Sequence, residues 1–101
     1  MSATETGAVM SVTDIATPMA SRYLQQLCKH FAHKLDVTFD ETAGSIAFSA
    51  GICRLQAEDE TLRISLEPVD KADLDRLQDV VVRHLIRFAF REELEIAWHP
   101  A

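Results

Sequence analysis

Two long amphipathic segments constrain the fold of this chain more than any other feature. Residues 18–34 and 70–93 each place their apolar side chains on one stripe when drawn at about 100° per residue. A helix with a single apolar stripe buries it against another layer of structure. The sequence therefore predicts two helices that cover one common surface. Their stripes are Ala20, Tyr23, Leu24, Leu27 and Phe31 in the first helix, and Leu74, Leu77, Val81, Leu85 and Phe88 in the second.

The residues before each segment are typical of helix starts. Thr17 can accept a backbone N–H as the N-cap of the first helix, and Pro18 suits the first helical position because its missing donor costs nothing there. Asp70 is expected to cap the second helix in the same way. Both helices therefore have a defined beginning in the sequence.

The rest of the chain alternates apolar and polar residues, which is typical of half-buried strands. The alternating runs are centred near Val12, Val37, Ile46, Leu55, Ile64 and Ile96. The predicted order is β-α-β-β-β-β-α-β, and four consecutive strands favour antiparallel hairpins. We therefore expect an α+β fold, a two-layer sandwich with a mostly antiparallel sheet and two helices on one face.

The face of the sheet turned away from the helices is predicted to be polar, with small residues in its middle. It could be an ordinary solvent-facing surface, or a flat surface that pairs with a second copy of the chain. Its members are Thr38, Ser45, Ala47, Ser49, Arg54, Gln56, Arg63 and Ser65.

Composition sets the class of protein. We expect a flexible N-terminal tail, residues 1–8, and a single domain over residues 9–101. The net charge of −6 disfavours nucleic acid as a partner. No apolar run approaches the roughly 20 residues of a membrane span, and the first residues do not resemble a secretory signal, so we expect a cytoplasmic protein with no membrane partner. Cys28 and Cys53 form no CxxC pair and are expected to be reduced and buried.

Histidine provides the sharpest candidate for a site. His30 and His84 lie beside the apolar stripes of the two helices, so their rings could meet if the helices lie side by side. Imidazole is a common ligand of zinc and iron, so His30 and His84 are the candidate ligands if the chain binds a metal ion. The alternative is a pair of packed histidines that hydrogen-bond to the backbone. Tyr23 and Arg87 would add polar groups to a ligand pocket between the helices and the sheet.

Arginine provides a second candidate. Arg83, Arg87 and Arg91 recur every four residues on the second helix and could receive a carboxylate or a phosphate. The alternative is a solvated helix face balanced by nearby acidic residues. If this row or the polar sheet face docks a partner, the chain is a homodimeric protein-interaction module with no small-molecule ligand.

Catalysis has little support in the sequence. Ser21 and Ser49 have no nucleophile-elbow context, and Cys28 has no neighbouring base in the sequence. The three glycines do not form a phosphate-binding loop. We therefore predict no catalytic residue, rank an enzyme last, and expect no cofactor other than a metal ion.

Two segments carry a resemblance to a known family. SRYLQQLCKHFAHK, residues 21–34, and HLIRFAFREELEIAW, residues 84–98, resemble the bacterial family called domain of unknown function 2218, and the resemblance extends over about residues 11–98. The family has no assigned catalytic residues. Similar domains lie beside or within siderophore-interacting proteins, which implies a small binding or accessory module linked to iron or siderophore handling, with a siderophore-interacting protein as a partner.

Overall fold

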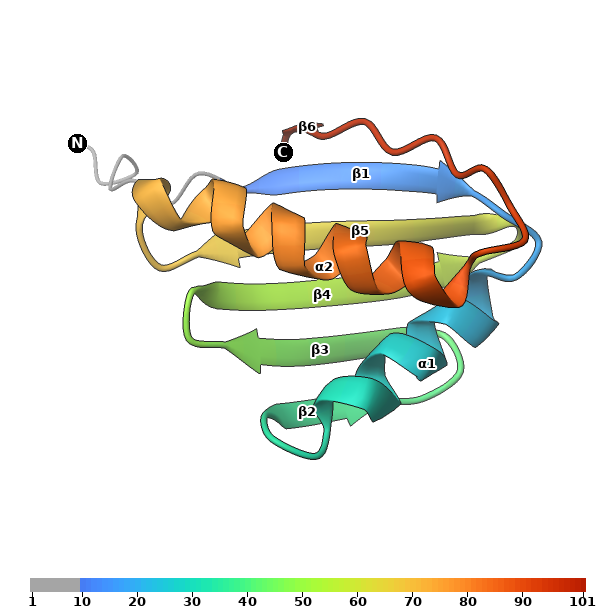
Figure 1. Cartoon of the computed structure of the whole chain (residues 1–101), viewed down its shortest axis with the longest axis horizontal. Helices are drawn as coiled ribbons and strands as arrows, with labels where there is room; N and C mark the ends of the chain where they lie inside the picture. Colours follow the sequence, from blue (N-terminus) through green and yellow to red (C-terminus); the bar gives the residue numbers. More distant parts are fainter. Residues whose placement is uncertain (1–9) are drawn as a thin grey trace.

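The computed structural model describes residues 10–101 and has two layers, a six-stranded sheet and two helices that cover one of its faces (Figure 1). The predicted order of elements and the α+β class are confirmed. The predicted tail, residues 1–8, and Val9 of the first predicted strand lie outside the described residues. The elements are β1 (Ser11–Ala16), α1 (Ala20–Phe31), β2 (Asp36–Phe39), β3 (Ala43–Phe48), β4 (Gly51–Glu58), β5 (Thr61–Pro68), a 3₁₀ turn η2 (Lys71–Asp73), α2 (Leu74–Phe88) and β6 (His99–Pro100).

The strands lie in the order β2-β3-β4-β5-β1-β6, and every neighbouring pair is antiparallel. The four strands from β2 to β5 form a meander joined by short connections, because each hairpin needs only a tight turn. Helix α1 carries the chain from β1, near one edge of the sheet, to β2 at the opposite edge (Figure 1). This crossing places α1 over the half of the sheet that β2, β3 and β4 form.

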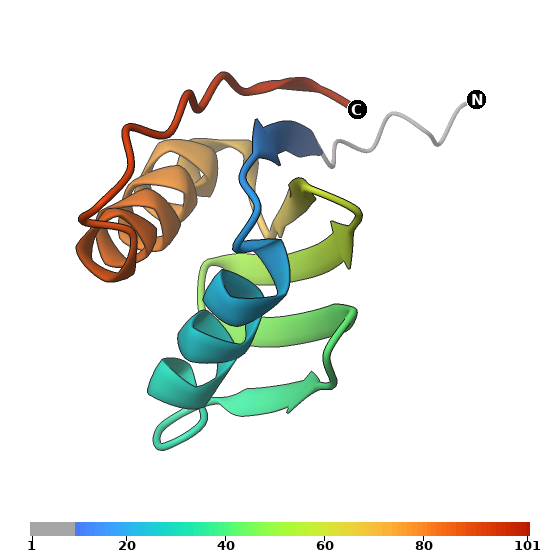
Figure 2. The ribbon, with the colours of Figure 1, turned by 90° about the vertical axis from the view of Figure 1, so that its right-hand side faces the viewer.

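Both helices lie on the same side of the sheet (Figure 2). Leu27 of α1 and Leu85 of α2 expose 1% and 0% of their surface, as the two apolar stripes predict. They belong to one core cluster with Leu62 and Ile64 of β5. The hydrophobic effect of this shared burial therefore holds the two layers together.

Two of the connections between strands each depend on the properties of one residue. The carboxylate of Asp40 accepts hydrogen bonds from the backbone N–H groups of Thr42 and Ala43, at 2.8 and 2.9 Å, and closes the turn between β2 and β3. Gly51 has φ +152°, and a Cβ atom there would lie 2.3 Å from the carbonyl oxygen of Glu67. Only glycine fits this close approach without strain.

The first helix begins later than its sequence predicts. Its N-cap is Met19, and no side chain caps it. Thr17 is buried, and its hydroxyl accepts a hydrogen bond from the N–H of Met19 at 3.1 Å. Thr17 therefore holds the turn that leads into α1, whereas the prediction that it caps the helix itself is wrong. Asp70 caps the 3₁₀ turn η2, because its carboxylate accepts from the N–H of Ala72, whereas the N-cap of α2 is Asp73 and no side chain caps it, so the prediction that Asp70 caps the second helix is wrong.

The last predicted strand is mostly irregular. Only His99 and Pro100 pair with β1, opposite Val12 and Ser11. Residues 93–101, called the C-terminal segment below, run back along the sheet beside β1 and α2 (Figures 1 and 2). Leu94, Ile96 and Trp98 are half-buried against the core and alternate with exposed residues. The alternation of apolar and polar residues in this segment therefore reflects packing of one side against the core, without the backbone hydrogen bonds of a strand. Within residues 10–101, no helix is both long enough and apolar enough to cross a bilayer.

Candidate functional site

The structure brings His30 and His84 together. His30 lies in the last turn of α1 and His84 lies in α2, and their ring centroids are 4.9 Å apart with 43° between the ring planes. The two helices contact each other at this point because each packs its apolar stripe on the same sheet. The sequence left open whether the two rings meet, and the structure shows that they do.

One of the two rings has a fixed tautomer. Nδ1 of His84 lies 2.7 Å from the carbonyl oxygen of Val80, one turn earlier in α2. A carbonyl oxygen only accepts, so Nδ1 carries the hydrogen of the neutral ring. Nε2 of His84 is then left with a free lone pair, which is the arrangement that second-shell carbonyls impose on metal-binding histidines.

Phenylalanine rings surround the histidine pair. Phe31 meets both imidazoles at centroid distances of 4.9 Å, and Phe88 lies 5.8 Å from His30. Phe48 of β3 supports Phe31 from the sheet, at 4.9 Å. These edge-on contacts hold the rings in place, because aromatic pairs favour this geometry.

The surroundings of the pair are positively charged. Burial lowers the pKa of His30, and the neighbouring His84, Arg87, His33 and Lys34 lower it further because each disfavours a second positive charge. The neutral ring of His30, which has a lone pair available, is therefore favoured. Arg87, a predicted site residue, lies close enough to His30 to lower its pKa.

Tyr23, the fourth predicted site residue, has a different partner. Its hydroxyl donates a hydrogen bond to the carboxylate of Glu92, which follows α2. The hydroxyl of Thr17 lies 3.0 Å from each oxygen of the same carboxylate. Burial and the bonded Glu92 raise the pKa of Tyr23 to about 12. Glu92 was not singled out from the sequence, because its partners Tyr23 and Thr17 lie 69 and 75 residues away.

The cysteines do not join the histidines. Cys28 and Cys53 are free and completely buried, and Cys28 packs under α1 against Gly44 of β3. Burial raises the pKa of Cys28 to about 11 and raises that of Cys53 as well. No group of three or more His, Cys, Asp or Glu side chains within residues 10–101 could hold a metal ion. A metal ion at the histidine pair would therefore have only two protein ligands from the described residues.

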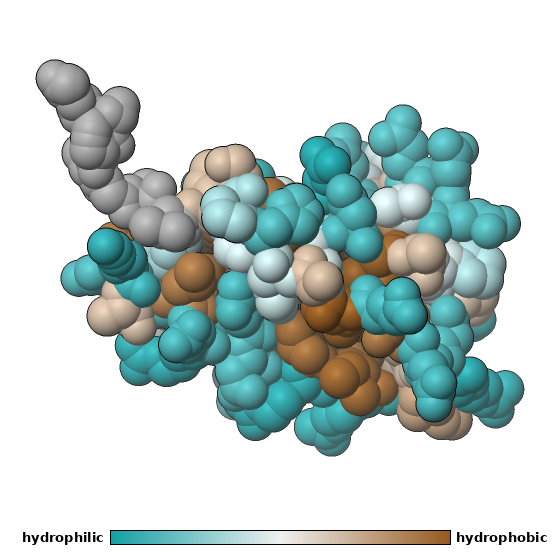
Figure 3. Space-filling view, turned by 90° about the horizontal axis from the view of Figure 1, so that it is seen from above, coloured by the Kyte–Doolittle hydropathy of each residue, from teal (hydrophilic) through white to brown (hydrophobic). Residues whose placement is uncertain are grey.

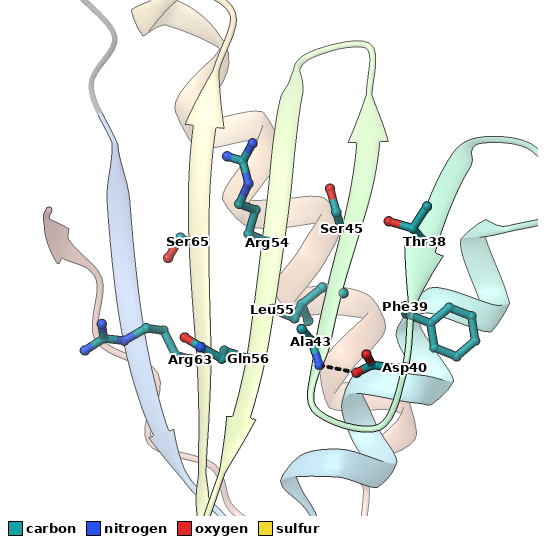
Figure 4. A pocket seen from close by; sticks show the side chains of 11 residues that line it. Thr38, Phe39, Asp40, Ala43, Ser45, Arg54, Leu55, Gln56, Arg63 and Ser65 are labelled. Carbon is teal, nitrogen blue, oxygen red and sulfur yellow. Dashed lines mark hydrogen bonds between the residues drawn. The ribbon is translucent and has the colours of Figure 1, made fainter.

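The bare face of the sheet carries a separate, open concavity of about 590 Å³ (Figure 4). Its floor is a cross-strand row in which Thr38 pairs with Ser45, Ser45 with Arg54, and Arg54 with Ser65. The predicted polar face thus lies where the sequence indicates. The predicted pocket residues Tyr23, His30, His84 and Arg87 lie outside this concavity.

The charges on this face are already matched. Arg54 forms an ion pair with Glu67 at 2.5 Å, and Arg63 donates two hydrogen bonds to the carboxylate of Asp14, at 2.7 and 3.0 Å. The hydrogen bond from Arg63 lowers the pKa of Asp14. Because each guanidinium already has a carboxylate, the face presents little net charge to a ligand.

Comparisons with known proteins agree with this fold. A family model described as uncharacterized protein conserved in bacteria (DUF2218) matches residues 12–99. The chain is similar to PA4090 from Pseudomonas aeruginosa, which was solved by NMR. The two are 39% identical, the match covers 92% of this chain and 97% of that chain, and the TM-score is 0.76. No curated protein matches the chain.

Proposed function

The chain belongs to the DUF2218 family of bacterial proteins, and from its paired histidines we propose that it is a binding module for a transition metal carried by an anionic chelator. His30 and His84 are the two protein ligands in this proposal. The chelator fills the remaining coordination positions. The observation that carries the proposal is the 4.9 Å approach of the two rings, with Nδ1 of His84 tied to the backbone.

The spacing of the rings suits one shared metal ion. Metal–nitrogen bonds to imidazole are about 2.0–2.1 Å long, so two imidazoles on one ion at tetrahedral or octahedral angles have centroids about 4.5–5.2 Å apart. The distance of 4.9 Å between His30 and His84 lies within this interval. Imidazole suits iron, zinc, copper and nickel, so ligand type alone does not select among these metals.

The charge around the pair favours a chelate over a bare cation. Arg87 and Lys34 carry positive charges, and both lower the pKa of His30. They repel a free divalent ion but attract a metal complex with net negative charge. Phe31 and Phe88 provide aromatic walls for the organic part of such a complex. A role around iron uptake, which the family resemblance implies, fits this chemistry.

The concavity on the bare sheet face is a weaker candidate. Small-molecule sites are mostly apolar with a few precisely placed polar groups. This face is open, and its two arginines are held by Glu67 and Asp14. Nothing in its lining favours one class of ligand, whereas the histidine pair favours a transition metal.

The test is calorimetric titration of the protein with ferric citrate, with zinc chloride and with citrate alone. We expect ferric citrate to bind best, and His30→Ala to weaken that binding at least about tenfold, since one metal bond is lost. His84→Asn removes Nε2 but leaves an amide N–H that can reach the carbonyl of Val80, so it separates loss of a ligand from loss of the helix contact. His99→Ala is the matched control, because His99 is an exposed histidine in β6.

A second readout locates the complex. Ferric iron broadens NMR signals of nearby protons, so bound ferric citrate should broaden the ring signals of Phe31 and Phe88 and leave those of Phe39 unchanged. Equal affinity in wild type, His30→Ala and His84→Asn would contradict the proposal, as would a complete absence of ferric citrate binding.

A further inference from the structure

Strand β2 lies at one edge of the sheet, and among residues 10–101 no strand pairs with its outer side (Figure 1). The opposite edge is covered, because β6 pairs with part of β1 and the C-terminal segment runs beside it. Figure 3 views the molecule from the side of this covered edge and shows hydrophobic side chains gathered near its middle. Strand β2 is therefore the edge that can accept another strand without displacing part of the chain.

The pairing of β2 with β3 identifies the backbone groups on the outer side of β2. The N–H of Asp40 donates to the carbonyl oxygen of Ala43 at 2.8 Å, so these two residues form a hydrogen-bonded pair. In an antiparallel ladder such pairs alternate with non-bonded pairs. By the register of the two strands, Val37 and Phe39 stand in non-bonded pairs. Their N–H and C=O groups therefore point away from β3, toward the free edge.

The side chains on the helix side of this edge are apolar. Leu35 and Val37 pack against the core, whereas Phe39 exposes 37% of its surface. A Cβ atom on Gly44 would lie 3.2 Å from Cβ of Phe39 and 2.7 Å from Sγ of Cys28, so Phe39 lies on the face that α1 covers. Its ring points away from β3 (Figure 4). The edge therefore offers open backbone groups together with an exposed aromatic ring.

We propose that β2 is an interface with a second copy of this chain, in which the two β2 strands pair antiparallel about a two-fold axis through Val37. A two-fold interface places one surface against itself. Val37 then faces the partner's Val37, and its N–H and C=O groups bond across the axis. Phe39 faces the partner's Leu35, so its exposed ring is covered by a side chain that borders the core. The two sheets become one continuous sheet with all helices on the same side.

Charge selects this register over pairing about Thr38, the other register that matches the outward backbone groups. Pairing about Thr38 would place Asp36 opposite the partner's Asp40, and like charges directly opposite each other are destabilising. Pairing about Val37 instead places Asp36 opposite the partner's Thr38. It also brings the turn that contains Lys34 toward the partner's Asp40. Lys34 forms no ion pair within residues 10–101, so its charge is free for this contact.

An unrelated extended peptide matches this edge less well. Strand β2 has four residues, so it offers a peptide few backbone hydrogen bonds. A peptide would also have to supply an apolar side chain opposite Phe39 and an uncharged residue opposite Asp36. A second copy supplies both, and it supplies them twice because the interface is two-fold. The interface does not rest on the proposed metal site, since it uses neither His30 nor His84.

The first test is sedimentation equilibrium of the full chain up to about 1 mM, the range in which weak complexes form. We expect concentration-dependent dimerisation of the wild type. Val37→Pro removes an outward N–H but no bond to β3, and proline is tolerated at such positions of edge strands. It should raise the dimer dissociation constant at least about tenfold.

A second variant tests the apolar contact. Phe39→Lys should also raise the dimer dissociation constant at least about tenfold, because it places a charge opposite the partner's Leu35. Phe90→Lys is the matched control, since Phe90 is 74% exposed and follows α2, far along the chain from β2. Circular dichroism establishes that each variant folds. A strictly monomeric wild type, or equal effects of Phe39→Lys and Phe90→Lys, would overturn the proposal.

The third test checks the register by disulfide cross-linking. In the proposed register Asp36 and the partner's Thr38 form a non-bonded pair, whose Cα atoms are about 4.5 Å apart, within the range that a disulfide spans. An equimolar mixture of Asp36→Cys and Thr38→Cys should therefore form a linked dimer under mild oxidation, and each variant alone should not. Cys28 and Cys53 are buried and do not interfere. Mass spectrometry without reductant measures the linked species.

The cross-linking outcomes separate the alternatives. Linking of Thr38→Cys with itself would show pairing about Thr38 and would overturn the proposed register. A mixture of the two folded variants that yields no linked dimer at about 1 mM would overturn the interface itself.

Discussion

Tyr23 of α1 donates a hydrogen bond to Glu92, which lies 69 residues later, just after α2. The bond joins the first turns of one helix to the end of the other. Glu92 also receives the hydroxyl of Thr17. One partly buried carboxylate therefore ties three separate parts of the chain together, at the point where the C-terminal segment leaves α2.

Tyr23→Phe should destabilise the fold by about 1–3 kcal/mol, because it leaves the Glu92 carboxylate with Thr17 as its only partner in that network. Urea denaturation measures the change. Glu92→Gln removes the charge but keeps an acceptor, so it should cost less than Tyr23→Phe. Equal stability of Tyr23→Phe and the wild type would contradict this role of the hydroxyl.

Tyr23 should titrate near pH 12 in the folded protein. The chain has one tyrosine, so ultraviolet absorbance of the phenolate reports Tyr23 alone. Its pKa is raised to about 12 from the ordinary value near 10. The neutral phenol is favoured by folding, so the stabilisation it gives is complete below pH 10 and is lost as pH rises toward 12. A transition near pH 10 in protein that is still folded would show that the buried bond is absent.

Gly44→Ala should be destabilising by about 1–3 kcal/mol because the new Cβ atom would lie 2.7 Å from Sγ of Cys28. Cys28→Ala removes that sulfur, so the double variant should recover part of the loss. Thermal unfolding of the four proteins gives the coupling energy. At Gly51 the clash is with backbone, and Cys28→Ala should not rescue Gly51→Ala. Purely additive effects at Gly44 and Cys28 would refute the contact.

Leu85→Ala should cost about 2–5 kcal/mol, because Leu85 is completely buried between α2 and the sheet. Ile86→Ala, at the next position, should change stability by about 0.5 kcal/mol or less in dilute protein. Chemical denaturation gives the free energy of unfolding of both variants and so shows which face of α2 packs against the sheet. Comparable losses at the two positions would mean that α2 is packed differently.

Both thiols should resist alkylation in the native protein at pH 8. Cys28 and Cys53 are fully buried, and burial raises the pKa of each, so neither forms the reactive thiolate. Mass spectrometry after iodoacetamide should show no adduct in the folded chain and two adducts in urea. Rapid labelling of one cysteine in native conditions would show that this part of the core opens.

The sequence predicts the layers well because both signals are periodic. The stripes that contain Leu27 and Leu85 become the core, and the alternation around Ile64 becomes β5. The sequence places His30 and His84 beside stripes that pack on the same sheet, but the contact between the two rings is known only from the structure. An alternating pattern does not distinguish a hydrogen-bonded strand from an irregular segment that packs one side against the core. The sequence therefore predicts a strand over residues 94–98, where the structure has none.

Long-range polar contacts lie beyond such reasoning. Glu92 belongs to a run of charged residues, and its spacing does not indicate that it turns inward to Tyr23. Thr17 has the sequence of a helix cap, but its burial beside Glu92 gives it a different partner.

The outer edge of β1 is paired along only two of its six residues, opposite His99 and Pro100. Beyond that short ladder, residues 93–98 lie beside the strand without pairing with it. Proteolytic cleavage after Glu92 would release this covering and convert an interior strand into an open template for backbone hydrogen bonding. Extended peptides, including the same strand of another molecule, could then add to the sheet, so this cleavage should promote association of the chain through the edge of β1.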